Sequence, residues 1–267
     1  MKSILAMITL CTFIHASGLA ADKPAVERME WQVDGVTREA LVYAPAEAKN
    51  TNTPLLFAFH GHGGTAKYAA AKYNYQKQWP DAIAVYMQGL PCAGKTDPDG
   101  LLPGWQKTAG DLQDRDLKFF DAVLATLKKD FKVDPKRVYC TGHSNGAVFT
   151  YLLWGARGDV FAAVAPVSGV ALGGFKDFKP LPALHVAGEK DLIVPIKYQM
   201  QTMEGARKLN GCDTEGAPWA TSGTLVGTVY PSKTGTPFVS VVYPGTHAFP
   251  DEAPELIAKF FKEHARE

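Results

Sequence analysis

Residues 142–146 read Gly142-His143-Ser144-Asn145-Gly146, and this pentapeptide is the most informative stretch of the chain. It follows a strand-like run at residues 137–140 and precedes an apolar run with helical periodicity at residues 147–153. A serine on so sharp a strand-to-helix turn takes a strained backbone conformation, and the flanking glycines let strand and helix approach closely. The helix N-terminus then directs free N–H groups toward the serine hydroxyl. The pattern predicts a nucleophilic Ser144, and the alternative is a plain glycine-rich turn.

Short apolar runs alternate with helical patterns along most of the chain. The apolar runs are typical of buried parallel strands and lie at residues 54–59, 82–87, 137–140, 162–167, 183–187 and 238–243. The helical patterns lie at residues 66–78, 112–131, 195–209 and 252–264. This alternation predicts an α/β fold, a mostly parallel sheet flanked by helices on both faces. In such sheets functional residues gather at the carboxyl ends of the strands.

Three further segments complete the predicted organisation. Residues 29–33 and 36–43 flank the turn signal Asp34-Gly35 and predict a β-hairpin. Residues 89–111 are rich in Gly, Pro and Asp, and residues 210–236 are rich in Gly, Thr and Ser. Both are predicted to be long loops, either lid-like and functional or surface insertions.

The composition places bounds on the function. The chain has 267 residues, of which 46% are hydrophobic and 21% charged, as in a soluble globular protein. A net charge of +1 gives no electrostatic footprint for nucleic acid or an anionic membrane. The sequence contains neither CxxC nor HxxxH spacing, and His60 and His62 have no evident third ligand. We therefore expect neither a metal nor an organic cofactor, and one catalytic domain over residues 22–267.

The first 21 residues have the pattern of a secretory signal peptide. Lys2 supplies a positive charge, residues 4–14 form a short apolar core, and cleavage is expected after Ala20 or Ala21. The apolar run is short for a membrane span. We expect a secreted or periplasmic protein that has no membrane association after cleavage, and the sequence does not indicate an oligomeric state.

A nucleophilic serine needs a base, and the base needs an orienting acid. A Gly-x-Ser-x-Gly turn is the nucleophile elbow of the α/β-hydrolases, in which the acid and then the histidine follow the serine along the chain. His247 comes just after the last predicted strand and a turn, so it is the predicted base. His185 lies inside a strand pattern and is predicted to be packed in the core. His264 is predicted to be solvated in the terminal helix.

Two acidic residues compete for the orienting role. Asp191 and Glu189 both follow the strand predicted at residues 183–187, whereas Asp177 and Asp213 lie farther from any strand end. The strand pattern alone leaves Asp191 and Glu189 as alternatives.

The oxyanion of a tetrahedral intermediate needs two backbone N–H donors. One is expected from Asn145, the residue after the serine. The other is expected from the loop His60-Gly61-His62-Gly63-Gly64, which directly follows the buried strand at residues 54–59. Its glycines let the backbone approach a substrate oxygen.

These motifs and their order resemble a known group of enzymes. The chain is similar to the secreted esterases related to polyhydroxybutyrate depolymerases, feruloyl esterases and acetylxylan esterases, the carbohydrate esterase family 1. The resemblance covers about residues 30–265, and it rests on residues 60–64, 133–139, 142–146, 161–169, 188–191 with Pro195, and 245–247.

The resemblance implies an α/β-hydrolase fold and a serine esterase that works through an acyl-enzyme without a cofactor. Carried over residue by residue, it implies a catalytic triad of Ser144, Asp191 and His247. It also implies that the second oxyanion donor is the N–H of His62, with that of Gly63 as the alternative.

The cysteines depart from the family pattern. Cys11 lies in the predicted signal peptide, and Cys140 is predicted to be a buried, inert thiol. Members of the family carry an Asn-Gly-Cys segment, matched here by residues 210–212, with a cysteine partner further along the chain. No cysteine follows Cys212, so the family disulfide is either missing or rerouted to Cys92.

The substrate is an ester, and the sequence narrows its class only partly. Trp105 and Phe249 are candidate substrate-binding residues that could stack on a sugar or an aromatic acyl group, and the alternative for both is core packing. The resemblance favours a feruloyl or acetyl ester of plant polysaccharide. The alternative substrate is a polyhydroxyalkanoate ester. The alternative functions are a peptidase of the same fold and a non-catalytic binding protein.

Overall fold

The computed structural model describes residues 25–266, and twelve strands are assigned within them. The predicted signal peptide, residues 1–21, lies outside this part of the chain. The strands are β1 (Glu27–Val33), β2 (Val36–Tyr43), β3 (Thr53–Phe59), β4 (Ile83–Met87), β5 (Leu90–Pro91), β6 (Pro103–Gly104), β7 (Val133–His143), β8 (Ala163–Val167), β9 (Ala183–Gly188), β10 (Ala217–Ser222), β11 (Leu225–Tyr230) and β12 (Phe238–Tyr243).

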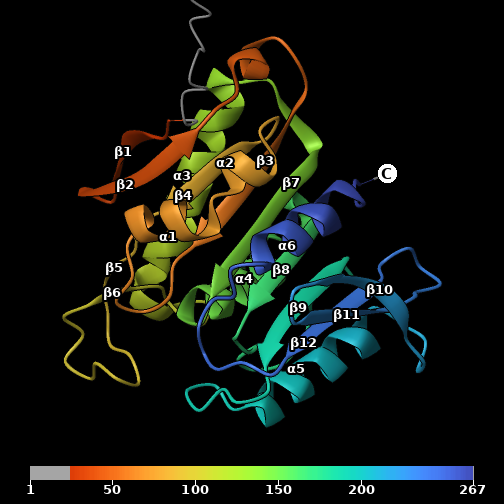
Figure 1. Ribbon diagram of the computed structural model, residues 1–267. Coiled ribbons are helices and arrows are strands. Elements are labelled where there is room, and N and C mark those ends of the chain that lie inside the picture. The colour runs from red at the N-terminus through yellow and green to blue at the C-terminus, as the bar shows by residue number, and fades with distance from the viewer. Residues whose placement is uncertain (1–24, 267) are drawn as a thin grey trace, which may run out of the picture.

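Ten of these strands form one sheet in the order β1-β2-β4-β3-β7-β8-β9-β12-β11-β10 (Figure 1). The six central strands, from β4 to β12, are parallel. The outer pairs β1-β2 and β11-β10 are joined to this centre in antiparallel fashion. The predicted α/β fold with a mostly parallel sheet is confirmed.

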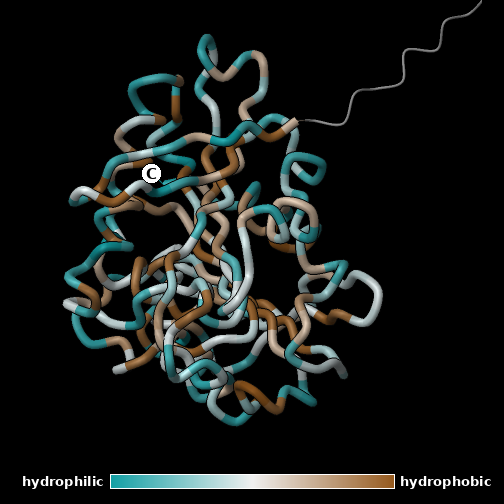
Figure 2. The backbone as a smooth tube through the Cα atoms, turned by 90° about the vertical axis from the view of Figure 1, so that its left-hand side faces the viewer, coloured by the Kyte–Doolittle hydropathy of each residue, from teal (hydrophilic) through white to brown (hydrophobic). Residues whose placement is uncertain are grey.

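Helices cover both faces of the sheet. One face packs against α3 (Arg115–Asp130), α4 (Asn145–Arg157) and α5 (Ile196–Leu209). The other packs against α1 (Ala66–Tyr73), α2 (Tyr75–Gln78) and α6 (Ala253–Lys262). All residues of β3 are buried, because this strand is covered on both faces. Figure 2 shows hydrophobic segments along the central strands and hydrophilic ones along outer turns.

The predicted hairpin is present. β1 and β2 pair from Val33 and Val36 outward, around the turn Asp34-Gly35. Both turn residues have positive φ, 49° for Asp34 and 78° for Gly35, as a two-residue hairpin turn requires.

Three predicted boundaries are wrong for local reasons. Residues 210–236 are not a structureless loop, because β10 and β11 form a hairpin that extends the sheet beyond β12. The helix predicted at residues 66–78 is divided at Asn74, whose φ is 47°. The helix predicted from residue 112 begins at Arg115, because residues 112–114 have φ between 50° and 58°.

The segment at residues 89–111 is mostly irregular. It contains the two-residue ladder of β5 with β6 and ends where the 3₁₀ turn η2 (Asp111–Asp114) begins. Two further 3₁₀ turns are η1 (Ala46–Lys49) and η3 (Gly158–Val160).

The disulfide considered between Cys92 and Cys212 is absent, and both thiols are free, as is that of Cys140. Cys92 follows β4 and so lies at the carboxyl edge of the parallel strands. Cys212 follows α5, which runs back to the opposite edge, and its Sγ lies 3.9 Å from the carbonyl oxygen of Thr236, just before β12. The two residues are therefore at opposite ends of the sheet. Within residues 25–266, no helix is both long and apolar enough to span a membrane.

Candidate active site

Ser144 forms the sharp turn between β7 and α4. Its φ is 55° and its ψ is −116°, a strained combination for a residue with a side chain. The flanking glycines permit this turn. A Cβ on Gly142 would lie 2.3 Å from the carbonyl oxygen of Gly146, and a Cβ on Gly146 would lie 2.4 Å from that of Phe59. The backbone thus places the hydroxyl at the carboxyl edge of the sheet.

Three loops bring Ser144, His247 and Asp191 together. His247, after β12, has its Nε2 at 2.8 Å from the Oγ of Ser144. Its Nδ1 lies 2.8 Å from the Oδ2 of Asp191, after β9. The competing Glu189 is exposed and lies outside this chain of contacts. The arrangement allows the carboxylate of Asp191 to accept a hydrogen bond from the protonated Nδ1 of His247. The unprotonated Nε2 is then free to accept the proton of the Ser144 hydroxyl.

The carboxylate of Asp191 is fully buried and accepts four hydrogen bonds. Oδ1 accepts from the backbone N–H groups of Ile193 at 2.9 Å and Val194 at 2.8 Å. Oδ2 accepts from His247 and from the amide Nε2 of Gln199, the latter at 3.1 Å. Four donors match the lone-pair capacity of an ionised carboxylate, so the side chain is held in one orientation.

His143, the residue before the serine, also supports the base. Its Nε2 donates to the main-chain carbonyl of His247 at 2.7 Å. Burial, followed by the nearby His247, lowers the pKa of His143 to about 4, so the ring is neutral near pH 7. The sequence does not indicate this role beyond placing a histidine inside the pentapeptide at residues 142–146.

The two candidates for the second oxyanion donor differ in their contacts. The N–H of Gly63 already donates to the carbonyl of Pro103 at 2.7 Å. The N–H of His62 has no acceptor among the described residues 25–266. The N–H of Asn145 is at the first position of α4, where a helix supplies no internal acceptor. His62 and Asn145 are therefore the pair that is free to bind a substrate oxygen.

Side-chain contacts hold both of these residues in place. Asn145 pairs with the main chain of Trp105, accepting at 2.7 Å and donating at 3.1 Å. The Nε2 of His62 lies 3.1 Å from the Oδ2 of Asp97, whose carboxylate also accepts from the N–H groups of residues 101 and 102. Both ring nitrogens of His60 are engaged, with Gly61 and with Gly89. In residues 25–266, no group of three or more His, Cys, Asp or Glu side chains is placed to hold a metal.

Known proteins resemble this chain over most of its length. Residues 104–180, which contain the Ser144 turn, match the prolyl oligopeptidase family. Feruloyl esterase C of Emericella nidulans is 30% identical over 196 residues, which are 72% of this chain and 69% of that enzyme. The chain belongs to the same family as feruloyl esterase C, a family of esterases with the α/β-hydrolase fold.

Two further relatives of this chain are named for other ester substrates. A bifunctional acetylxylan esterase/xylanase of Neocallimastix patriciarum is 29% identical over 62% of this chain, and the match spans only 23% of that longer protein. Poly(3-hydroxyalkanoate) depolymerase C of Paucimonas lemoignei is 26% identical over 70% of this chain and 52% of its own. The resemblance stated from the motifs is confirmed.

Solved esterase structures share the fold. Acetyl xylan esterase from Aspergillus awamori has a TM-score of 0.64 at 14% identity, covering 88% of this chain and 99% of that chain. A CE1 ferulic acid esterase from Anaeromyces mucronatus has a TM-score of 0.61 at 13% identity, covering 92% of each chain. At these identities the likeness concerns the fold alone.

In this esterase the two aromatic residues considered for substrate binding are buried. Trp105 is fully buried, and its ring stacks on that of Phe149 with centroids 5.4 Å apart. Phe249 is 3% exposed and stacks on Tyr73 with centroids 4.1 Å apart. The structure therefore corrects their description to core packing, because neither ring presents a face to a ligand.

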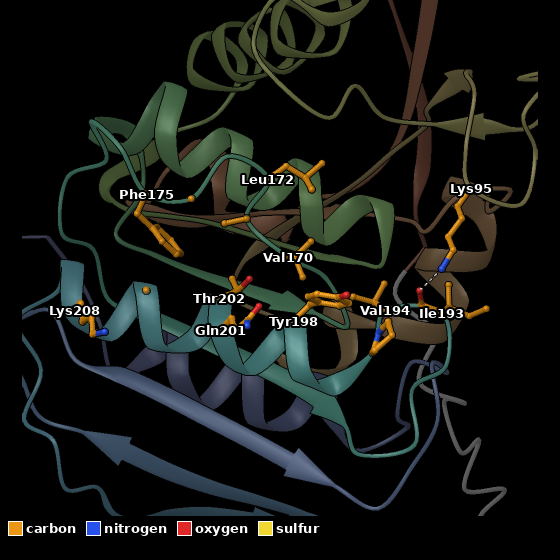
Figure 3. Close-up of a pocket in the computed structure, with 14 residues that line it drawn as sticks. Lys95, Val170, Leu172, Phe175, Ile193, Val194, Tyr198, Gln201, Thr202 and Lys208 are labelled. Carbon is orange, nitrogen blue, oxygen red and sulfur yellow. Dashed lines mark hydrogen bonds between the residues drawn. The ribbon is translucent and has the colours of Figure 1, made fainter.

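Sequence reasoning missed a pocket of 800 Å³ between α5 and the segment after β8 (Figure 3). Its wall is mostly apolar, and Lys95 and Lys208 lie at its two ends. The pocket adjoins the catalytic loops. Gly169 comes just before the first lining residue after β8, and a Cβ built on it would lie 3.1 Å from the carbonyl oxygen of Ser144. The loop after Asp191 forms another wall. The lining includes Val170, Leu172, Phe175, Ile193, Val194, Tyr198 and Thr202.

Proposed function

We propose that this esterase hydrolyses a carboxylic ester through an acyl-enzyme on Ser144 and that its substrate is a feruloyl ester of plant polysaccharide. The unbroken contact from Asp191 through His247 to Ser144, with both distances at 2.8 Å, carries the proposed chemistry. Family membership supports the ester as the bond cleaved.

In the proposed mechanism His247 acts first as a base and then as an acid in each half-reaction. His247 Nε2 takes the hydroxyl proton while Ser144 Oγ attacks the ester carbonyl, and the oxyanion is bound by the N–H groups of His62 and Asn145. His247 then gives the proton to the departing alcohol oxygen, which leaves an acyl-enzyme. A water, deprotonated by His247, then attacks the acyl carbon. The bond from that carbon to Ser144 Oγ breaks as His247 returns the proton to Oγ, which releases the acid and restores the free serine. Asp191 holds the imidazole tautomer and stabilises its protonated form.

No triad residue lines the pocket, but Ile193 and Val194 in its wall donate to Asp191, and its size supports a bulky acyl group over an acetyl group. An apolar wall that includes Phe175 and Tyr198 suits an aromatic ring, which gains from burial and from edge or face contacts. An acetyl group would leave a pocket of 800 Å³ almost empty.

The length of the pocket supports a second candidate substrate, an extended polyhydroxyalkanoate chain. Its wall follows α5 from Pro195 to Lys208, about 20 Å at 1.5 Å per residue. One phenylpropanoid acid is shorter than this, whereas a hydroxyalkanoate oligomer could fill it. The relative named poly(3-hydroxyalkanoate) depolymerase C makes this candidate chemically consistent with the family.

A substrate panel separates these candidates. Purified protein is assayed on methyl ferulate, acetylated xylan, a 3-hydroxybutyrate trimer and a prolyl p-nitroanilide, the last because of the prolyl oligopeptidase match. The highest kcat/KM on methyl ferulate supports the first proposal, and the highest on the trimer supports the second. Cleavage of the anilide and of none of the esters would contradict the proposed esterase activity and indicate a peptidase.

A fluorophosphonate probe tests the nucleophile independently of the substrate. Wild-type protein is expected to label once and Ser144→Ala not at all, with circular dichroism showing that the variant is folded. Equal labelling of both would remove Ser144 as nucleophile.

Export is proposed on the charged start, apolar core and small residues of the N-terminal 21 residues. N-terminal sequencing of protein recovered from the periplasm or culture medium is expected to begin at residue 21 or 22. Recovery of the full-length chain from the cytoplasm alone would contradict export.

A further inference from the structure

A buried row of polar side chains leads away from Asp191 on the side opposite His247. Gln199 on α5 is fully buried and contacts Asp191 through its amide nitrogen at 3.1 Å. Its amide oxygen lies 3.0 Å from the Nε2 of His185 on β9. The Nδ1 of His185 lies 2.7 Å from the hydroxyl of Tyr151 on α4. All three side chains are buried at the interface of β9 with two helices.

The direction of each hydrogen bond in this row is fixed by its neighbours. The Nε2 of Gln199 also lies 2.7 Å from the carbonyl oxygen of Val194, which can only accept, so the amide nitrogen must face Val194 and Asp191. The amide oxygen of Gln199 must then accept a proton from His185 Nε2. Burial lowers the pKa of His185 to about 4, so the ring is neutral and carries one proton. Its Nδ1 therefore accepts from the hydroxyl of Tyr151.

Every donor in the row thus points toward the catalytic carboxylate. Tyr151 donates to His185, His185 to Gln199 and Gln199 to Asp191. Hydrogen bonds arranged head to tail polarise one another, so the last donor is strengthened by the two before it. Gln199 shares the Oδ2 of Asp191 with His247 and draws electron density from the oxygen that the imidazole uses.

We propose that Gln199 is a positioning residue for Asp191 and that His185 and Tyr151 strengthen it, so that the row tunes the basicity of His247. The proposal rests on the triad of the proposed function. Without the Gln199 amide, Oδ2 carries more negative charge and stabilises the His247 imidazolium more strongly. The pKa of His247 is then expected to rise, and the acid limb of the kcat/KM profile to move to higher pH.

The titratable groups nearest the pair are His143, Tyr243, Lys95 and Lys72, with His62 in the neighbouring loop, and all of them are unchanged in the Gln199 variant. The pKa of His143 on β7 is lowered to about 4 by burial, and that of Tyr243 on β12 is raised to about 12 by burial. Lys95 contacts the carbonyl of Ile193, and Lys72 lies near His143; both cations are present in wild type and variants alike. A shift in the pH profile of a Gln199 variant therefore reports on the Asp191–His247 pair.

The test compares Gln199→Met, which keeps the length and removes the amide, with Tyr151→Phe, which removes only the first donor of the row. Gln32→Met is the matched control, because Gln32 is exposed on β1 at the edge of the sheet. Gln199→Met is expected to lower kcat by roughly 10- to 100-fold, as for the loss of a hydrogen bond to a charged group. Tyr151→Phe is expected to shift the acid limb in the same direction by a smaller amount, and Gln32→Met not at all.

A second measurement keeps this test independent of the substrate. The titration of the His247 ring is followed by ¹H–¹⁵N NMR, its signal identified by loss in His247→Gln. The midpoint is expected to rise by roughly 0.5 pH unit in Gln199→Met. Unchanged midpoints in both Gln199→Met and Tyr151→Phe would overturn the positioning role. If Gln199→Met does not fold, the midpoint in Tyr151→Phe decides. Absence of fluorophosphonate labelling in the wild-type protein would overturn the proposed function. The NMR midpoints would still decide whether Gln199, His185 and Tyr151 affect His247.

Discussion

The imidazole of His143 donates a hydrogen bond of 2.7 Å to the main-chain carbonyl of His247. The residue before Ser144 on β7 therefore holds the loop that carries His247 after β12. The ring centroids of the two histidines are 5.0 Å apart. The hydrogen bond therefore helps to fix the position of the His247 ring relative to that of His143. The position of His247 over Ser144 is therefore supported by a side chain outside the row of contacts from Asp191 to Ser144.

His143→Phe is expected to lower kcat by roughly 10-fold, because the carbonyl of His247 loses its donor and the base becomes less well placed. His143→Gln keeps an N–H donor and is expected to lose less. Both are assayed on methyl ferulate with thermal unfolding as a check of the fold. Equal kcat in wild type and His143→Phe would show that the contact is dispensable.

Asp191→Asn is expected to lower kcat by roughly 10⁴, because an amide favours the wrong imidazole tautomer. Glu189→Gln is the matched change at the neighbouring acidic position and is expected to have wild-type activity, since Glu189 is exposed. Steady-state kinetics of the two purified variants make the comparison. Loss of activity in Glu189→Gln together with retained activity in Asp191→Asn would show that Glu189, and not Asp191, is the orienting acid.

Thr202→Phe is expected to fill the pocket along α5 and to raise KM for methyl ferulate about 10-fold, while turnover of p-nitrophenyl acetate stays near that of wild type. Thr202 lines the pocket, whereas Met200 on the same helix is 46% exposed and lies outside its lining. Met200→Phe is therefore the control. If both variants handle both esters alike, the acyl group binds elsewhere.

The free energy of unfolding is expected to fall as the pH is lowered from about 6.5 to about 4. Burial lowers the folded-state pKa of His60, His143 and His185 to about 4 each, below the ordinary value of 6.5. The unfolded chain binds more protons in this window, so protonation favours unfolding. Each histidine adds a slope of at most about 1.4 kcal/mol per pH unit.

Urea titrations at pH 7, 6 and 5 measure this slope. His143→Gln is expected to reduce it, whereas His264→Gln, at a half-buried residue after α6, is expected to change it less. A stability that rises between pH 7 and 5 would contradict the burial of neutral imidazoles.

The sequence was sufficient for the central strands and for the three residues Ser144, Asp191 and His247 that the structure brings together. The parallel strands are covered on both faces, so they appear as continuous apolar runs. The prediction that His185 is packed in the core is confirmed, since the residue is fully buried. The prediction of a solvated His264 is wrong, because the ring is half-buried and lies 4.3 Å from that of Phe260.

Other features depend on contacts that no local pattern encodes. β10 contains a proline and no fully buried residue, because it is an edge strand with little core to cover. Gln199 and His185 lie on different elements, and only the packing of α5 against β9 joins them. The opposite placement of Cys92 and Cys212 likewise follows from the direction of α5, which the sequence spacing does not show.

The contact between His62 and Asp97 limits where this protein can be engineered. Asp97 belongs to the irregular segment after β5, yet it holds the ring of the residue whose N–H is free beside Ser144. Shortening that segment, or inserting a tag into it, is expected to remove activity even in a well-folded protein. The turn at Gly35 is a better insertion point, because no atom lies within 4 Å of the position a side chain would take there. A fusion partner placed at that hairpin would extend from the edge strands of the sheet and leave the catalytic loops untouched.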